Sequence, residues 1–327
     1  MASSTDSSSP RKSPVGLKAI AIACNVSINT VSRALRDCSD ISTATKNRIR
    51  AKAIEMGYVP NRLASALKSG STKSVYLIFN NLKSPYFTIM ANRIVYLLQQ
   101  QGYNTLIAPN FSISCTKENV QQALLSRAEG IITFLEPTEE AVLIAKLNAL
   151  PMVLVGRRTE FEGVDQIYTD DVKGGYLAAE YLISKGCRKL LYISADGLEC
   201  SVRRLQGFRT RAFKEGCFVE NVSESDMGSV LEGSFKKRYD GVFCFNEQIA
   251  LKFASLMEQR FPEERIPIVG YDGLINQIFA CQNIPCVSYD ATAIADESFK
   301  VLMDRIEDFY GHSYVDEMYD VKMINLE

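Results

Sequence analysis

The chain has 327 residues, of which 46% are hydrophobic and 23% charged, and its formal net charge is −1. The length predicts two or three compact units, and the composition is typical of a globular protein. No run of eighteen apolar residues occurs, and the Ser-rich N-terminus lacks the apolar segment of a secretory signal. We therefore expect no membrane span, no export, and a disordered leader over residues 1–15.

The sequence contains few residues that could form a metal site or support catalysis by histidine. The only histidine is His312, in a polar Gly-His-Ser turn, and the nine cysteines include no C-x-x-C pair. We expect reduced thiols, no metal site and no cofactor. Asp170 and Asp171 form an acidic pair of the kind that general acid–base catalysis uses, but they are adjacent at a strand-to-helix junction, where side chains diverge. We interpret both as helix N-caps and expect no enzyme activity.

The charge is divided unevenly along the chain. Residues 1–73 carry twelve Lys and Arg against four Asp and Glu, whereas the remainder carries 25 against 34. Because phosphate backbones are held mainly by cationic side chains, a nucleic acid would bind the N-terminal part of this molecule.

Residues 17–56 have the pattern of three short helices. Ser27 is a suitable N-cap for the second helix, and the third is expected from residue 42 or 43 to about 56, ended by Gly57. Two short helices joined by a tight turn, the second with small polar and guanidinium side chains outward, fit a DNA major groove. The apolar face of the first helix follows the spacing i, i+3, i+4 and i+7, at Leu17, Ile20, Ala21 and Cys24.

Three motifs extend this pattern: ValSer-x-x-ThrValSerArg at 26–33, GlyTyr-x-ProAsn-x-x-Ala at 57–64 and AlaLeuLys at 66–68. Over some fifty residues without a gap, the segment resembles the lactose/galactose-repressor (LacI/GalR) family of bacterial transcription regulators. The resemblance implies an all-α helix-turn-helix DNA-binding domain over 16–60, a hinge helix and linker over 61–73, and an effector-binding and dimerisation core over 74–327.

The resemblance also assigns DNA contacts. Arg33 can donate two hydrogen bonds to a guanine, Asn29 can address an adenine, and Ile28 can touch a thymine methyl group. In the hinge, Leu67 would enter the minor groove as an apolar wedge that unstacks bases, followed by Lys68. The phosphate contacts implied by the family are Ser27, Thr30, Ser32, Tyr58 and Asn61.

From residue 74 onward, apolar strands alternate with amphipathic helices, which is typical of parallel sheets covered on both faces. With the family resemblance, this pattern predicts an α/β two-lobed core like the periplasmic binding proteins, built on two parallel doubly wound sheets. The first lobe is expected to include about 74–169 and 290–316, and the second about 170–289 and 317–327. The expected strands lie at 75–79, 104–108, 130–135, 152–155, 166–170, 189–194, 241–245 and 267–272.

Ligands of such folds bind beyond the carboxyl ends of the strands and between the lobes. An arginine, an asparagine and an aspartate in one cleft can hold vicinal hydroxyls, and aromatic faces can cover a sugar ring, so a carbohydrate effector is favoured. A purine stacked on Tyr86 and Phe87 and a phosphoprotein co-repressor are the alternatives. The effector residues expected from the resemblance and the strand ends are Ser84, Tyr86, Phe87, Arg157, Arg204, Asn246 and Asp272.

The chain departs from some sugar-responsive relatives at Gly156, where they have an aspartate. Arg157 and Arg158 follow, which favours an acidic or phosphorylated ligand, unless these arginines pair with Glu160 or Glu162 on the surface. The sequence is compatible with both interpretations, an anionic ligand and a surface ion pair.

Together these observations predict a cytoplasmic homodimeric regulator, most often a repressor in this family, that binds a palindromic DNA operator under the control of a small molecule. Two copies are expected because one recognition helix reads too few base pairs. The rival hypothesis is a ligand-binding protein whose N-terminal helices serve another partner.

Overall fold

The computed structural model describes residues 15–59, 70–80, 84–232, 235–275 and 284–324. The chain divides into two compact units, Met1–Gly70 and Ser71–Glu327, which we call the head and the core. No helix in the described ranges is long and apolar enough to cross a membrane.

The head contains three helices, α1 (Leu17–Cys24), α2 (Ile28–Leu35) and α3 (Thr43–Glu55). Ser27 caps α2, because its hydroxyl oxygen accepts a hydrogen bond of 3.0 Å from the backbone N–H of Thr30. The three expected helices and the Ser27 cap are confirmed. The buried side chains that join the helices are Ile20, Ala21, Cys24, Val31, Ala34, Ile49 and Ala53.

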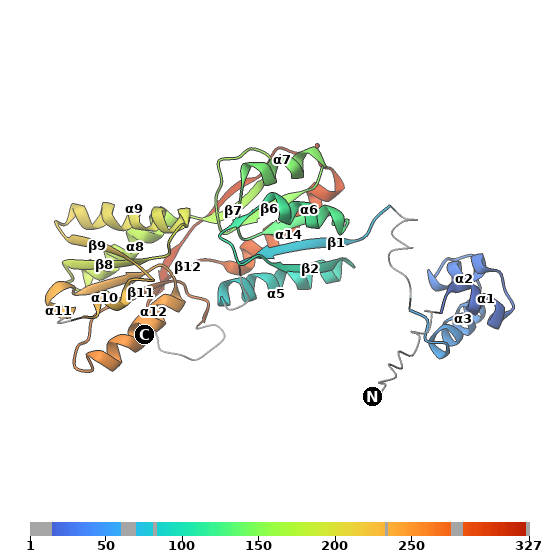
Figure 1. Ribbon diagram of the computed structural model, residues 1–327, viewed down its shortest axis with the longest axis horizontal. Helices are drawn as coiled ribbons and strands as arrows, with labels where there is room; N and C mark the ends of the chain where they lie inside the picture. Colours follow the sequence, from blue (N-terminus) through green and yellow to red (C-terminus); the bar gives the residue numbers. More distant parts are fainter. Residues whose placement is uncertain (1–14, 60–69, 81–83, 233–234, 276–283, 325–327) are drawn as a thin grey trace, which may run out of the picture. The chain divides into compact units, whose positions relative to one another are not determined.

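The core has two lobes, each built on a six-stranded sheet (Figure 1). In the first lobe all strands are parallel, in the order β13-β7-β6-β4-β1-β2; in the second the order is β14-β12-β11-β10-β8-β9, and only β14 is antiparallel. The first sheet comprises β1 (Ser74–Phe79), β2 (Asn104–Pro109), β4 (Gly130–Thr133), β6 (Met152–Val155), β7 (Asp165–Thr169) and β13 (Asp316–Tyr319). The second comprises β8 (Lys189–Ser194), β9 (Phe218–Ser223), β10 (Gly241–Cys244), β11 (Ile268–Asp272), β12 (Cys286–Ser288) and β14 (Lys322–Ile324), and a small two-stranded sheet pairs β3 (Ser114–Cys115) with β5 (Glu136–Pro137).

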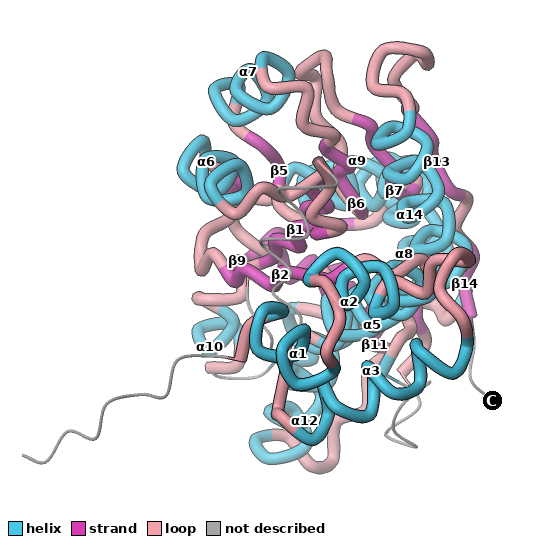
Figure 2. The backbone as a smooth tube through the Cα atoms, turned by 90° about the vertical axis from the view of Figure 1, so that its right-hand side faces the viewer, coloured by secondary structure: helices cyan, strands magenta, loops and turns pink. Residues whose placement is uncertain are grey.

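Helices cover both faces of each sheet, as the alternating pattern predicts. On the first lobe α6 and α7 lie on one side of the sheet and α5 and α14 on the other, which Figures 1 and 2 show in two orientations. The first-lobe helices are α5 (Pro85–Gln100), α6 (Lys117–Leu125), α7 (Glu139–Leu147) and α14 (Ala291–Glu307). The second-lobe helices are α8 (Asp171–Ser184), α9 (Glu199–Lys214), α10 (Met227–Val230), α11 (Phe235–Arg238) and α12 (Glu247–Arg260).

The chain passes between the lobes three times: after β7, after β12 and after β13. In the structure these strands end at Thr169, Ser288 and Tyr319, and the sequence analysis expects the crossings near residues 169, 290 and 316. The last crossing comes only after Tyr319, because β13 pairs with β7 in the first sheet. The short polar segment Asp-Glu-Met-Tyr at an exposed sheet edge lacks the apolar pattern that would have identified a strand.

Helices α8 and α9 approach each other unusually closely. A Cβ atom at Gly175 would lie 1.8 Å from the carbonyl oxygen of Arg204, and one at Gly207 would lie 1.8 Å from that of Val172. Only glycine fits at these two positions, and the tight contact fixes α9, which carries Arg204.

Candidate binding sites on the head and in the core

The outward face of α2 in the head is polar and accessible. Ile28 is 48% exposed, Asn29 is exposed, and Arg33 is partly exposed, whereas Val31 and Ala34 on the opposite face are buried. The three residues expected to contact bases therefore lie on the face that is not used for packing. This arrangement is one that a DNA major groove accepts.

Arg33 has an acidic neighbour that the sequence pattern did not reveal. Its guanidinium lies 2.7 Å from a carboxylate oxygen of Asp40, in the turn between α2 and α3. The hydrogen bond from Arg33 lowers the pKa of Asp40. No spacing rule links positions 33 and 40, because the pair depends on how the turn folds back.

The remaining DNA candidates differ in their surroundings. The Ser27 hydroxyl is engaged in the α2 cap and also lies 2.8 Å from the Thr30 hydroxyl, and Ser32 is partly exposed. Tyr58 packs against the head cluster. Asn61, Leu67 and Lys68 lie outside the described residues.

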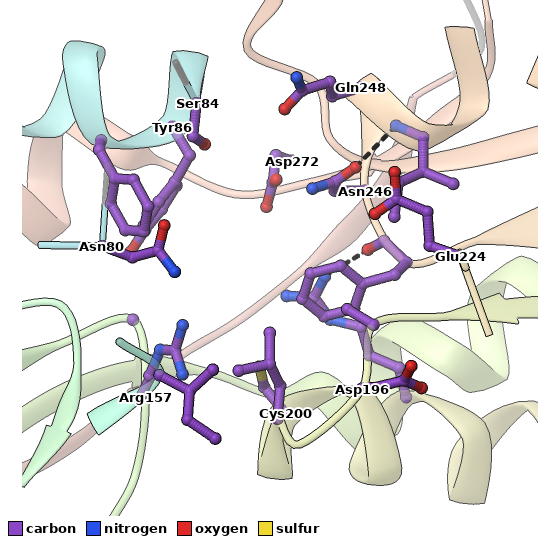
Figure 3. Close-up of a pocket in the computed structure, with 18 of the residues that line it drawn as sticks. Asn80, Ser84, Tyr86, Arg157, Asp196, Cys200, Glu224, Asn246, Gln248 and Asp272 are labelled. Atoms are coloured by element: carbon purple, nitrogen blue, oxygen red, sulfur yellow. Dashed lines mark hydrogen bonds between the residues drawn. The ribbon is translucent and has the colours of Figure 1, made fainter. Parts of the chain in front are cut away.

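A cavity of about 610 Å³ lies between the two lobes of the core (Figure 3). Residues from the carboxyl ends of strands in both sheets line it, as expected for this kind of fold. The cavity brings together all seven residues expected to bind an effector: Ser84, Tyr86, Phe87, Arg157, Arg204, Asn246 and Asp272.

Arg204 is held rigidly at the second-lobe wall. Its Nε donates a 2.7 Å hydrogen bond to Asp171, another nitrogen donates to the carbonyl of Phe245, and the guanidinium lies 3.4 Å from the ring centre of Tyr271. Both members of the ion pair are at least 94% buried, and burial raises the pKa of Asp171 although Arg204 opposes this effect. Two of the five N–H donors of Arg204 are thus occupied by these hydrogen bonds.

The interpretation of the acidic pair at the start of α8 is half wrong. Asp170 is the N-cap, because its carboxylate accepts a 2.9 Å hydrogen bond from the backbone N–H of Lys173. Asp171 is instead the buried counter-charge of Arg204. The first turn of α8 places the two carboxylates on different sides of the chain, so they are not paired with each other.

Asn246 and Asp272 present polar groups from the ends of β10 and β11. The Asn246 side-chain oxygen accepts from the backbone N–H of Ile249 at 2.8 Å and caps α12, which leaves its amide N–H₂ group for the cavity. Asp272 accepts a 3.1 Å hydrogen bond from the hydroxyl of Tyr289, and burial raises its pKa to about 6. Its φ of 86° is unusual for a residue other than glycine and is typical of functional positions.

The aromatic residues of the first lobe contribute unequally. Phe87 is only 8% exposed, because its ring packs against Phe79 and Phe134 with ring centres 6.0 and 5.7 Å apart. Tyr86 covers more of the cavity wall, and Figure 3 shows it beside Asn80 and Ser84. Of the two adjacent rings expected to stack on a ligand, Tyr86 and Phe87, mainly Tyr86 is available.

Arg157 and Arg158 have different environments. Arg157 lines the cavity, whereas Arg158 lies over the ring of Tyr168, 5.8 Å from its centre. Among the described residues neither arginine forms an ion pair with Glu160 or Glu162, so the structure gives no support to a surface pairing.

Several lining residues were missed by the sequence reasoning. Glu224 follows β9 and Tyr289 follows β12, two strands that were not recognised, because β9 is half-exposed and polar and β12 is very short. Asp196 lies between β8 and α9, and Cys200 lies in the first turn of α9. The position directly after each sheet strand is the signal that would have found most of them.

Polar donors and acceptors thus surround a space large enough for a small molecule. Among the residues that the structure describes, no group of three or more His, Cys, Asp or Glu side chains could hold a metal ion. The fold and the two sites define a class of protein: a helix-turn-helix head joined to a two-lobed core with a ligand cleft.

Comparison with known proteins narrows this class to one family. Residues 16–61 match the family model described as "Bacterial regulatory proteins, lacI family", and residues 72–233 match "Periplasmic binding proteins and sugar binding domain of LacI family". The chain belongs to the LacI family and is a DNA-binding transcriptional regulator with a ligand-binding domain.

Individual relatives match over nearly the whole chain. The HTH-type transcriptional repressor PurR of Vibrio atlanticus (strain LGP32) is 24% identical, and the match covers 94% of this chain and 99% of the relative. The fold is similar to that of the lac repressor dimer bound to operator and the anti-inducer ONPF, with a TM-score of 0.78, 17% identity and coverage of 96% and 98%. It is also similar to the transcriptional regulator CelR–cellobiose complex, with a TM-score of 0.64, 20% identity and coverage of 95% and 98%.

Proposed function

We propose that this protein is a homodimeric repressor that binds a palindromic operator and is controlled by a small molecule in the cavity between the lobes. The observation that carries the proposal is the convergence of seven separately expected side chains on that single cavity, in a core that follows a basic helix-turn-helix head. A regulator of this kind works in the cytoplasm, on the chromosome, and needs no catalytic group.

On DNA, α2 would lie in the major groove. Arg33, Asn29 and Ile28 would contact base edges, because they occupy the accessible face of the helix. The proposed backbone contacts are Ser27, Thr30, Ser32, Tyr58 and Asn61, with Leu67 and Lys68 in the minor groove. Support for a dimer comes from the fold similarity to the lac repressor, whose structure is that of a dimer bound to operator.

For the effector we propose a sugar or a sugar derivative. Asp272 accepts hydrogen bonds, the Asn246 amide and Arg204 donate them, and together they suit a ring with several hydroxyl groups. The fold similarity to CelR in complex with cellobiose supports the same class of ligand. Closure of the lobes around the effector would shift the segments that carry the two hinges and thereby change operator affinity.

A planar heterocycle such as a purine is the second candidate. It is favoured by the aromatic side chains of Tyr86, Phe245 and Tyr289 in the cavity wall, and disfavoured by the burial of Phe87. The two candidates differ in how many polar side chains of the cavity they leave without a hydrogen bond, because a purine has fewer hydrogen-bonding groups for Asp272 and Asn246.

Operator selection followed by a ligand screen tests the proposal. Random duplex DNA is enriched on the full-length protein, and a palindromic consensus bound by two protomers, with an affinity that falls steeply with salt, is the expected result. Sugars, sugar phosphates and nucleobases are then tested by thermal shift, and each hit by operator binding. Failure to enrich any palindrome at low ionic strength contradicts the DNA part, and hits confined to nucleobases contradict the sugar part.

A further inference from the structure

Three cationic side chains line the cleft, and they differ in their partners. Arg204 is paired with Asp171 at 2.7 Å, and Lys252 is paired with Glu224 at 3.0 Å. Arg157 forms neither an ion pair nor a hydrogen bond with any residue that the structure describes. Its guanidinium is therefore the one in this lining without an ion-pair partner among the described residues. The charge of Arg157 only opposes the rise in the pKa of Glu136, which burial causes, and forms no ion pair with that carboxyl group.

The sequence shows whether an acidic partner of Arg157 could lie in a segment of the core outside the described ranges. The segments of the core outside the described ranges contain no Asp or Glu apart from the terminal Glu327. A hidden acidic partner for Arg157 in an internal segment is thereby excluded.

The residue before Arg157, Gly156, packs directly against the side chain of Tyr86. Gly156 has a φ of +72°, and a Cβ atom there would lie 1.9 Å from the Tyr86 hydroxyl oxygen. That hydroxyl is buried and has no hydrogen-bond partner among the described residues. A buried hydroxyl without a partner is unfavourable, and the Tyr86 hydroxyl lies within the electrostatic influence of both Asp272 and Arg157.

The opposite part of the cleft has a different chemistry. Figure 3 shows Arg157 and Cys200 at the lower side of the cavity and Asp272, Asn246 and Gln248 at its upper side. The upper groups are suited to uncharged hydroxyls, whereas the guanidinium presents a fork of N–H donors that matches the oxygens of a phosphate or a carboxylate.

We propose that the effector is anionic: a hydroxylated ring that carries a phosphate or carboxylate group, with that group bound by Arg157. The inference rests on the proposed function of the cleft as the effector site. It adds the charge of the ligand and the end of the cleft at which that charge lies.

Matched probes test the charge directly. Glucose, glucose 6-phosphate and glucuronate form one set, and ribose and ribose 5-phosphate another, each measured by calorimetry on the full-length protein. The anionic members are expected to bind at least about ten-fold more tightly than their neutral parents, since a charge-assisted hydrogen bond contributes at least this factor. The phosphate and carboxylate arms identify which anion is preferred.

Arg157→Gln is expected to abolish the preference for anionic probes, and Arg157→Lys to retain part of it because the charge remains. Arg158→Gln is the matched control: it removes the adjacent guanidinium, which lies over Tyr168 outside the cavity, and should keep the preference.

Two results would overturn the inference: equal affinity for neutral and anionic probes, or no anionic probe bound. In each case the operator assay is independent: operator release by a neutral sugar would uphold the proposed function while the anionic effector is rejected.

Discussion

At the scale of single residues, the contacts of two charged side chains lead to predictions. The first concerns Asp40, which lies 2.7 Å from Arg33 on the surface of the head. If Arg33 contacts a base, DNA must compete with Asp40 for the guanidinium. Where the DNA has no guanine to accept the hydrogen bonds of Arg33 in place of Asp40, loss of the ion pair would weaken binding. Asp40→Asn should therefore strengthen binding to scrambled duplex more than binding to the selected operator, lowering the affinity ratio about ten-fold.

The control for Asp40→Asn is Glu55→Gln, which makes the same change in charge but affects a residue paired with Lys52 on α3. Fluorescence anisotropy with both duplexes at fixed salt gives the ratio. An identical change in the two variants would mean that only the net charge of the head matters and that Asp40 has no specific role.

The second residue-scale prediction compares two neighbours. Asp171→Ala removes the partner of a buried arginine and should lower the free energy of unfolding of the core by about 3–5 kcal/mol. Asp170→Ala removes only an N-cap and should cost about 1 kcal/mol. Urea unfolding followed by circular dichroism distinguishes them, and equal losses would contradict the structural difference between the two carboxylates.

At the scale of elements, the contact between α8 and α9 positions the ligand wall. Gly207→Ala would bring a methyl group against the carbonyl of Val172, so the helices must separate and Arg204 must move. We expect a loss of about 1–3 kcal/mol in stability and a weaker response to any effector. Gly228→Ala, in α10, meets no atom within 4 Å and is the control. A stable Gly207→Ala protein with an unchanged effector response would refute this role.

At the scale of the whole molecule, the proposed dimer needs an interface. The edge strands of the two sheets both expose apolar side chains: Ile107 on β2 is 53% exposed and Phe218 on β9 is 57% exposed. Large exposed apolar groups on sheet edges are typical of surfaces that pair with another chain. We predict that Ile107→Asp combined with Phe218→Asp weakens dimerisation roughly a hundred-fold and abolishes operator binding.

Sedimentation equilibrium and operator titration measure both effects. Phe213→Asp is the matched control, because Phe213 is 85% exposed on α9 and is not on an edge strand. A dimer that persists in the double variant would place the interface elsewhere, and a monomer that still binds the full palindrome tightly would contradict the need for two copies.

Local periodicity and ungapped motifs are sufficient to predict several features of this protein from its sequence. These are the three head helices, the Ser27 cap, the alternation of strands and helices, and the positions after the strands that line the cleft. Local patterns succeed here because each is set by residues within a few positions of one another. The family followed from the motifs at 26–33 and 57–68, and the matches to family models confirm it.

The partner of each charged side chain, in contrast, depends on long-range contacts in the folded chain. The sequence predicts Asp171 as a helix cap, but it is the counter-charge of Arg204, 33 positions away. It predicts Phe87 as a ligand surface, but this side chain is mostly packed in the core, and Arg157 has no ion-pair partner among the described residues. The short strand β13 likewise became visible only through its pairing with β7. These features depend on contacts between segments far apart in the chain, and no spacing within one segment encodes such contacts.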